Sequence, residues 1–188
     1  MGFVMDEATL RLLEVAGSWL SGVGALLAVV VSLRLARQQT AIKLAVRAGL
    51  RIVVTPGERE TPEFVAVRVV NLGQQPVIVT SVGWRWGIFR KQYAFQTLHQ
   101  IGLGQVVPVQ LTTGQEANFF VPLNGGWMTR MAGDLDPNFP KLAAWMMRVQ
   151  VSTSVGKIIT RPLEPGLRKK LADTRAKIPN ASDKPRNA

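Results

Sequence analysis

The chain has 188 residues, of which 47% are hydrophobic, and a formal net charge of +11 at pH 7. That length accommodates one ordinary domain and a membrane segment, but not two large domains. The sequence has no cysteine and one histidine, which excludes disulfides, thiolate catalysis and cysteine- or histidine-rich metal centres. The positive charge predicts an anionic neighbour, namely phospholipid head groups, nucleic acid or an acidic protein.

A run without any charged residue occupies residues 15–33, after a short N-terminal segment at residues 1–14. A helix over this run spans about 28 Å at ~1.5 Å per residue, close to the hydrocarbon core of a bilayer. We therefore predict a transmembrane helix over 15–33, in preference to a buried helix of a soluble core. A cleaved signal peptide is disfavoured, because the first ten residues contain two acids and no lysine or arginine.

Charge is distributed unevenly around this run. Arg11 and three acids precede it, whereas five basic residues follow it closely: Arg34, Arg37, Lys43, Arg47 and Arg51. The positive-inside rule then places the N-terminus outside and everything after Arg34 in the cytoplasm. The prediction is a single-pass protein of the inner membrane, with an envelope-side domain of inverted topology as the alternative.

Small residues recur at every fourth position of the apolar run, in two registers. The first register contains Gly17, Ser21 and Ala25, and the second contains Gly24, Ala28 and Ser32. Such stripes permit close approach of two helices and favour a homo-oligomer or docking on another membrane protein.

The helix is predicted to continue as a juxtamembrane amphipathic helix over residues 34–49. On a helical wheel its apolar residues share one side and its basic residues occupy the rest. The basic residues expected to contact anionic lipid head groups are Arg34, Arg37, Lys43 and Arg47.

From residue 50 the pattern changes to alternating apolar and polar residues, and we predict a β-sandwich over 50–163 within a mainly β chain. Its seven to eight strands are expected at 50–56, 64–70, 77–86, 89–96, 105–111, 117–123, 146–152 and 157–163. A loop is expected at 124–140, with a helical turn at 141–144. Gly73 is expected to take a positive φ, and Trp84 or Trp86 with Phe119 or Val121 to lie in the core.

Two stretches carry a resemblance to known proteins: NLGQQPVIVTSVGW at 71–84 and LTTGQEANFFVPL at 111–123. Their turn and core residues resemble those of bacterial immunoglobulin-like domains, without the cysteine pair of antibody domains. The layout is also similar to small uncharacterised bacterial and phage membrane proteins with one N-terminal span and such a domain. This resemblance implies a fold and brings no catalytic residues.

A search for catalytic chemistry finds no defensible site. Asp134 and Asp136, with Asn138 beside them, lack the spacing of a calcium loop. His99 has no recognisable nucleophile turn, and the glycines at 102 and 104 lack the third glycine of a phosphate-binding loop. We therefore expect a protein that is not an enzyme, with no cofactor and no metal.

Two basic segments are better explained by interactions. The stretch WRWGIFRK at 84–91 alternates tryptophan with arginine, so that inward tryptophans would leave Arg85, Arg90 and Lys91 for contact with a partner. An exposed aromatic and basic face would instead bind single-stranded nucleic acid. Residues 164–188 are basic and poor in aromatics, and we predict a flexible tail, with at most a short helix at 167–177, that is solvated or contacts lipid or nucleic acid.

Together these patterns predict a membrane-anchored, cytoplasm-facing module that binds or positions a protein partner at the inner membrane. Anionic lipid is the expected second partner. The alternatives are a membrane-tethered nucleic-acid-binding protein and an envelope-side domain that acts in phage exclusion or envelope assembly.

Overall fold

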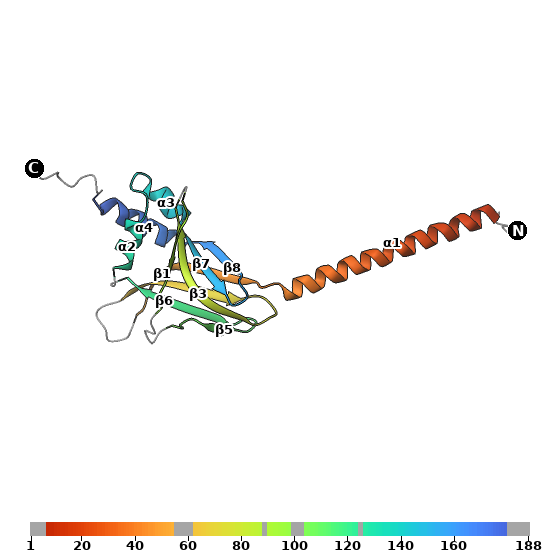
Figure 1. Ribbon diagram of the computed structural model, residues 1–188, viewed down its shortest axis with the longest axis horizontal. Coiled ribbons are helices and arrows are strands. Elements are labelled where there is room, and N and C mark those ends of the chain that lie inside the picture. Colours follow the sequence, from red (N-terminus) through yellow and green to blue (C-terminus); the bar gives the residue numbers. More distant parts are fainter. Residues whose placement is uncertain (1–6, 55–61, 88–89, 99–103, 124–125, 180–188) are drawn as a thin grey trace, which may run out of the picture. The chain divides into compact units, whose positions relative to one another are not determined.

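The computed structural model describes residues 7–54, 62–87, 90–98, 104–123 and 126–179 (Figure 1). The chain divides into two compact units, residues 1–41 and residues 42–188. The first unit is a long apolar helix, and the second is a mixed α/β region with two antiparallel sheets. Helix and strand contents are roughly equal, so the prediction of a mainly β chain is corrected.

The first unit contains helix α1, Glu7–Thr40. Its segment from Leu10 to Arg37 has a mean hydropathy of 1.9 and no buried residue in its most apolar window, whereas a core helix of a soluble protein is mostly buried. Glu7 in the first turn and Arg37 in the last have the charges that the helix dipole favours. The helix is therefore long and apolar enough to cross a membrane, as a signal sequence would also be, and it contains the predicted span.

Helix α1 ends at Thr40 and strand β1, Leu44–Ile52, follows it. The prediction of one helix over 34–49 is therefore wrong from residue 41 onward. Leu44, Val46 and Ala48 are buried on alternate positions of β1, with exposed Arg47 between two of them. This period of two belongs to a strand. The helical wheel combines apolar residues from two different elements, which explains the error.

The second unit holds its described strands in two sheets. One sheet has the order β1-β2-β6, and the other has the order β4-β3-β7-β8 with β5 also paired to β3, all antiparallel. The bounds are β2 Glu63–Asn71, β3 Val77–Trp86, β4 Gln92–Phe95, β5 Val109–Leu111, β6 Glu116–Pro122, β7 Arg148–Thr153 and β8 Ile158–Pro162. Each strand overlaps a predicted one. The predicted first strand begins six residues too late, and its positions 55–56 lie outside the described residues.

Apolar residues from both sheets share one core. They occupy alternate positions, as expected for strands that bury one face. Residues with no exposed surface include Val65, Val67, Val69, Val79, Val82 and Phe119. Trp84, Trp86 and Val121 are also buried, which confirms the predicted core residues.

Asn71 closes the turn between β2 and β3. Its fully buried side chain accepts the N–H of Gly73 at 2.9 Å and donates to the carbonyls of Gln75 at 2.8 Å and Leu111 at 3.0 Å. Side-chain bonds of this kind replace backbone pairing in turns. The turn therefore forms without a positive φ at Gly73, which corrects that prediction. Strand β3 begins directly after Pro76, as a residue without an N–H requires.

Helices α2, Trp127–Gly133, and α3, Pro140–Met146, interrupt the predicted loop at 124–140 (Figure 1). Helix α3 coincides with the predicted helical turn, whereas α2 is new. Trp127 packs edge-on against Trp84, with ring centroids 5.0 Å apart. Both indole N–H groups donate to the side-chain oxygen of Gln96, at 3.0 and 3.1 Å, which fixes α2 against the sheet.

Helix α4, Pro165–Lys177, replaces most of the predicted flexible tail at 164–188. Leu167 and Leu171 lie one helical turn apart and are fully buried. Arg175 is also buried and donates through Nε to the carbonyl of Leu135 at 3.0 Å. The prediction of a flexible tail is therefore wrong for 165–177, because a few apolar residues on one helix face are enough to pack. The short helix allowed at 167–177 is present and begins two residues earlier. Residues 180–188 lie outside the described range.

Candidate functional site

Among the residues considered for catalysis, those that the structure describes form only local turn and helix-end contacts. His99 and Gly102 lie outside the described residues. Asp136 accepts the backbone N–H of Asn138 at 2.9 Å, which is a local turn contact, and Asp134 is the C-cap of α2. Within the described ranges, no three histidine or acidic side chains group in a way that could hold a metal ion.

A hollow with a wholly basic set of charged side chains lies between an outer strand of each sheet. Strand β1 is the outer strand of one sheet and β8 the outer strand of the other. The hollow between them, here called the β1/β8 groove, has a volume of about 620 Å³. It is lined by residues 42–47, Leu72 and residues 157–161.

The groove is closed at one end. There the backbone N–H of Glu164 donates to the carbonyl of Ala48 at 2.8 Å, so the chain after β8 pairs with β1. The Glu164 carboxylate lies over Gly49 and accepts two hydrogen bonds from Arg51, at 2.8 and 2.9 Å. A Cβ at residue 49 would stand 1.9 Å from an oxygen of that carboxylate, so a side chain there would displace the carboxylate from its present position.

At the other end, no backbone hydrogen bond joins the two strands in the part of the chain that the structure describes. The contact there is made by a side chain, because Lys157 Nζ donates a hydrogen bond to the carbonyl of Ile42 at 2.6 Å. Ile42 faces Lys157 and Ala48 faces Glu164, so β1 and β8 run in the same direction. The contact between the two strands is thus made by the main chain at the Ala48 end and by a side chain at the Ile42 end, and the groove lies between these two contacts.

Four cations line the groove: Lys43 and Arg47 from the β1 side, and Lys157 and Arg161 from the β8 side. All four are exposed, and no acid belongs to the described lining. The pKa of the Glu164 carboxyl, at the closed end, is lowered by the hydrogen bonds from Arg51 and, to a smaller extent, by the nearby charges of Arg51 and Arg47. The groove is thus a site of concentrated positive charge.

The structure divides the residues predicted to contact the membrane surface between the two units. Arg34 and Arg37 lie in α1, whereas Lys43 and Arg47 lie in the second unit and line the groove. Sequence reasoning missed Lys157 and Arg161. Their only local signal is a pair of basic residues four positions apart around the apolar Ile158 and Ile159, a spacing that Lys43 and Arg47 share.

The predicted partner contacts lie in β3 and just after it, toward the β4 edge of the second sheet and away from β8. Arg85 is partly exposed between buried Trp84 and Trp86, and its register neighbours are Tyr93 and Arg148. Arg90 and Lys91 are exposed. The tryptophans therefore face inward, and these two rings offer no exposed surface for stacking with nucleic-acid bases.

The small residues predicted for helix packing all lie on α1, and their side chains are exposed. An added Cβ at Gly17 or Gly24 would meet no atom within 4 Å in the described structure. Ser32 donates its hydroxyl to the carbonyl of Ala28 at 2.8 Å. No described side chain therefore covers the two glycines, and the Ser32 hydroxyl is bonded within its own helix.

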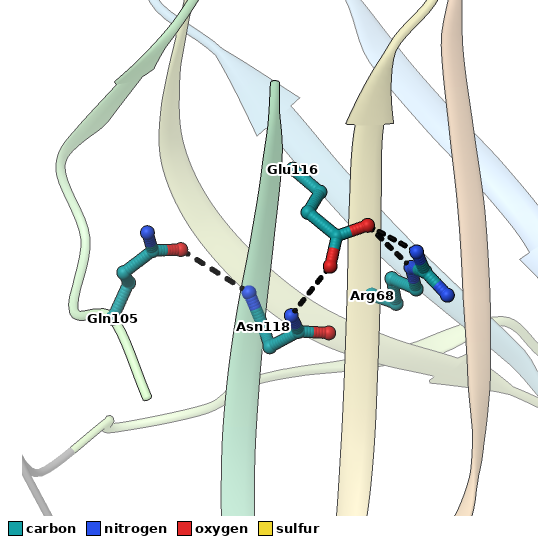
Figure 2. Close-up of polar contacts among 4 residues, drawn as sticks. All are labelled: Arg68, Gln105, Glu116 and Asn118. Atoms are coloured by element: carbon teal, nitrogen blue, oxygen red, sulfur yellow. Dashed lines mark hydrogen bonds and ion pairs between the residues drawn. The ribbon is translucent and has the colours of Figure 1, made fainter. Parts of the chain in front are cut away.

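The opposite edge of the three-stranded sheet is protected. Gln105 lies beside β6, with its N–H 2.9 Å from the carbonyl of Asn118 and its side-chain oxygen 3.2 Å from the N–H of Asn118. On the exposed face of the sheet, Glu116 pairs with Arg68 and accepts from the Asn118 amide (Figure 2). The Arg68 hydrogen bonds are the main cause of a lowered pKa at Glu116. One edge of this sheet is thus covered, whereas the β1 edge opens onto the groove.

The molecule therefore combines a long exposed apolar helix with a separate α/β region whose two sheets flank a basic groove. No family model and no curated protein matches the chain. A crystal structure of a Bordetella pertussis protein with the provisional name ApaA is 18% identical, covers 65% of this chain and 89% of its own, and has a TM-score of 0.29. The X-ray structure of structural-genomics target SoR45 is 9% identical, with coverages of 67% and 84% and a TM-score of 0.27. At such TM-scores these likenesses carry no argument about function.

Proposed function

We propose that the chain is a membrane-anchored, non-catalytic interaction module that binds or positions a protein partner at the inner membrane. One observation carries this proposal: α1 exposes its apolar side chains along its length, while the second unit buries its own core. Apolar side chains such as Leu20, 75% exposed, are stable in a lipid environment and costly in water.

The proposed topology has the N-terminus outside and the second unit in the cytoplasm. Its support is the charge asymmetry, with Arg34 and Arg37 at the C-terminal end of α1. Lys43 follows Arg37 by six residues, which is at most about 20 Å of extended chain. Anionic lipid head groups are therefore within reach of the first cations of the second unit.

For the second unit we propose an immunoglobulin-like β-sandwich. The order β1-β2-β6 against β4-β3-β7-β8 supports this, because it matches A-B-E against C′-C-F-G in such domains. Domains of this class bind partners through loops, faces and edges of their sheets. The open small-residue stripes of α1 further support self-association within the membrane.

The anchor is tested by fractionating cells that express the full chain. Retention in membranes after an alkaline wash, with an intact mass that includes α1, is the expected result. A soluble full-length protein would overturn the anchor, and a mass shortened by the helix would identify a signal sequence instead. Fusions of alkaline phosphatase and of a fluorescent protein to the C-terminus decide the orientation, and only the second should be active.

The interaction role is tested by crosslinking the full chain in native membranes. Recovery of one reproducible protein partner supports the proposal. Recovery of only the protein itself would reduce the role to a structural homo-oligomer. Recovery of nucleic acid, with binding that weakens steeply as salt increases, would favour the tethered nucleic-acid-binding alternative.

A further inference from the structure

The β1/β8 groove has a second property besides its charge, and this concerns the backbone. In an antiparallel pair, alternate residues direct both their N–H and their C=O toward the partner strand, and the others direct them away. Lys43 accepts from Leu72 on the β2 side, so the odd-numbered residues of β1 face β2. Leu44 and Val46 therefore direct their backbone groups away from β2 and toward the groove.

The same rule applies to β8. The carbonyl of Lys157 accepts from Thr153, so the odd-numbered residues of β8 face β7. Ile158 and Thr160 consequently direct their backbone groups away from β7 and toward the groove. In the described residues, β1 and β8 pair with no other strand on these sides. The groove is thus bordered on both sides by strand edges that can accept a further strand.

From this geometry we infer that the groove binds an extended acidic peptide segment of the partner, which adds as a strand between β1 and β8. Since the two strands already meet at Ala48 and Glu164, the room for an inserted strand lies toward the Ile42 end, where Lys157 must release the Ile42 carbonyl. From Ile42 to Ala45 the groove is about 10 Å long at ~3.3 Å per residue, which accommodates roughly three paired residues. Strand addition to a sheet edge is a common mode of peptide recognition.

The charges select the chemistry of that segment. Lys43 and Arg47 are exposed on the outer side of β1, whereas Lys157 and Arg161 share the inner side of β8 with buried Ile159. Both faces of an inserted strand would therefore lie near cations, which favours aspartate and glutamate. A second copy of this chain would bring the same four cations to the contact, so homotypic edge pairing is disfavoured.

A lipid phosphate matches the groove less well than a peptide does. Phosphate oxygens accept hydrogen bonds, so they can satisfy the N–H groups that face the groove but not the carbonyls. A peptide strand offers donors and acceptors in alternation and matches both edges. The inference rests on the proposed function, since it supplies the recognition chemistry of the interaction module.

The test uses the full chain in a neutral detergent, so that no anionic lipid is present and membrane anchoring is not required. The probe is a fluorescent seven-residue peptide of alternating glutamate and valine, and its binding is followed by anisotropy. The first control replaces the central valine by proline, which keeps the charge but removes a backbone donor. The second control replaces every glutamate by lysine. We expect binding of the acidic peptide, and at least about tenfold weaker binding of both controls.

Two variants locate the site. Thr160→Pro removes the N–H that faces the groove and leaves the pairing with β7 intact, and it should weaken binding about tenfold, whereas Thr160→Ala should not. The double variant Arg47→Glu with Arg161→Glu should abolish binding. Its matched control, Arg130→Glu with Lys141→Glu, reverses two exposed charges outside the groove and should bind normally.

Each contrary result has a definite meaning. Equal binding of the proline peptide would overturn strand addition and leave an electrostatic anion site. Failure of the acidic peptide to bind, with normal unfolding of the protein, would overturn the groove as a peptide site. Displacement of the bound peptide by micelles of anionic phospholipid, but not by inorganic phosphate, would assign the groove to lipid instead. None of these results affects the fractionation test, so failure of this inference and failure of the anchor are separable.

Discussion

Helix α1 and the core of the second unit contain similar side chains in opposite environments. In α1 the large apolar residues are 49–75% exposed, whereas Val65, Val67 and Val69 of β2 have no exposed surface. Composition alone does not separate the two regions, since both are rich in leucine, valine and alanine. The difference is that β2 has partner strands that cover its apolar side chains, and α1 has none in its own unit. The proposed membrane anchor accounts for this contrast, because lipid would cover the side chains that no protein partner covers in the first unit.

The largest expected effect comes from removing a core ring. Phe119→Ala leaves a cavity between the sheets and should reduce the free energy of unfolding by about 3–5 kcal/mol. Leu26→Ala in α1, where the side chain is 69% exposed, should change it by less than about 0.5 kcal/mol. Urea unfolding in detergent, followed by tryptophan fluorescence, measures both. Equal effects would remove the contrast between the two regions.

A charge in the middle of α1 tests whether this helix lies in the membrane. Val23→Arg should disfavour insertion into the bilayer by about 2.5–3.5 kcal/mol, without effect on the unfolding of the second unit. The control Leu35→Arg places the same charge between Arg34 and Arg37, where arginine already lies, and should insert normally. The measurement is the fraction of protein retained in alkaline-washed membranes. Full retention of Val23→Arg would contradict a transmembrane position.

Asn71 tests the converse case, a polar group in an apolar core. Asn71→Ala removes three hydrogen bonds and leaves the carbonyl of Leu111 and the N–H of Gly73 without their partner, so it should cost about 2–3 kcal/mol. Asn118→Ala, on the exposed face of β6, should cost less than about 1 kcal/mol. The same unfolding assay applies. A loss at Asn118 as large as that at Asn71 would show that burial does not set the cost.

The smallest effect concerns the ion pair at the closed end of the groove. Glu164→Gln should reduce stability by about 1 kcal/mol or less at pH 7, because Arg51 and Glu164 are partly exposed. The folded-state pKa of Glu164 is lowered, first by the Arg51 hydrogen bonds. Its stabilisation is therefore present above the ordinary glutamate pKa of about 4.3 and is lost as pH falls through the lowered value. The free energy of unfolding is measured at pH 7 and at strongly acidic pH, and the difference between variant and parent should vanish in acid. The control Asp173→Asn changes an exposed residue on α4 and should show no difference from the parent at pH 7.

The strands could be predicted from the sequence because their burial has a period of two that is visible without any partner. The helices of the second unit are less accessible: a helical turn within α3 and a short helix within α4 are expected, whereas α2 is not. Leu167 and Leu171 bury one narrow face of α4, and in a basic, polar segment that signal is weak until the surface beneath it is known. Helix α2 depends on the contact of Trp127 with Trp84 and Gln96, residues that lie more than thirty positions earlier. Tertiary contacts override local propensity in both cases.

Two of the four groove cations could be recognised from the sequence, because Lys43 and Arg47 belong to the basic cluster that follows the apolar run. Lys157 and Arg161 join them only because β1 and β8 are the outer strands of different sheets that meet at Ala48 and Glu164. That meeting is a contact between residues more than a hundred positions apart, and no local pattern contains it. The edge-facing backbone groups likewise follow from strand pairing and not from residue type.

The connection between the two units has a consequence for how a partner is found. Residues 41–43 form the linker between the end of α1 and the start of β1, and they span at most about 10–14 Å. With the helix anchored as proposed, so short a connection keeps the second unit tethered to the membrane. A partner that is itself tethered to that membrane then meets the groove at a millimolar effective concentration, so even a weak peptide contact would be occupied.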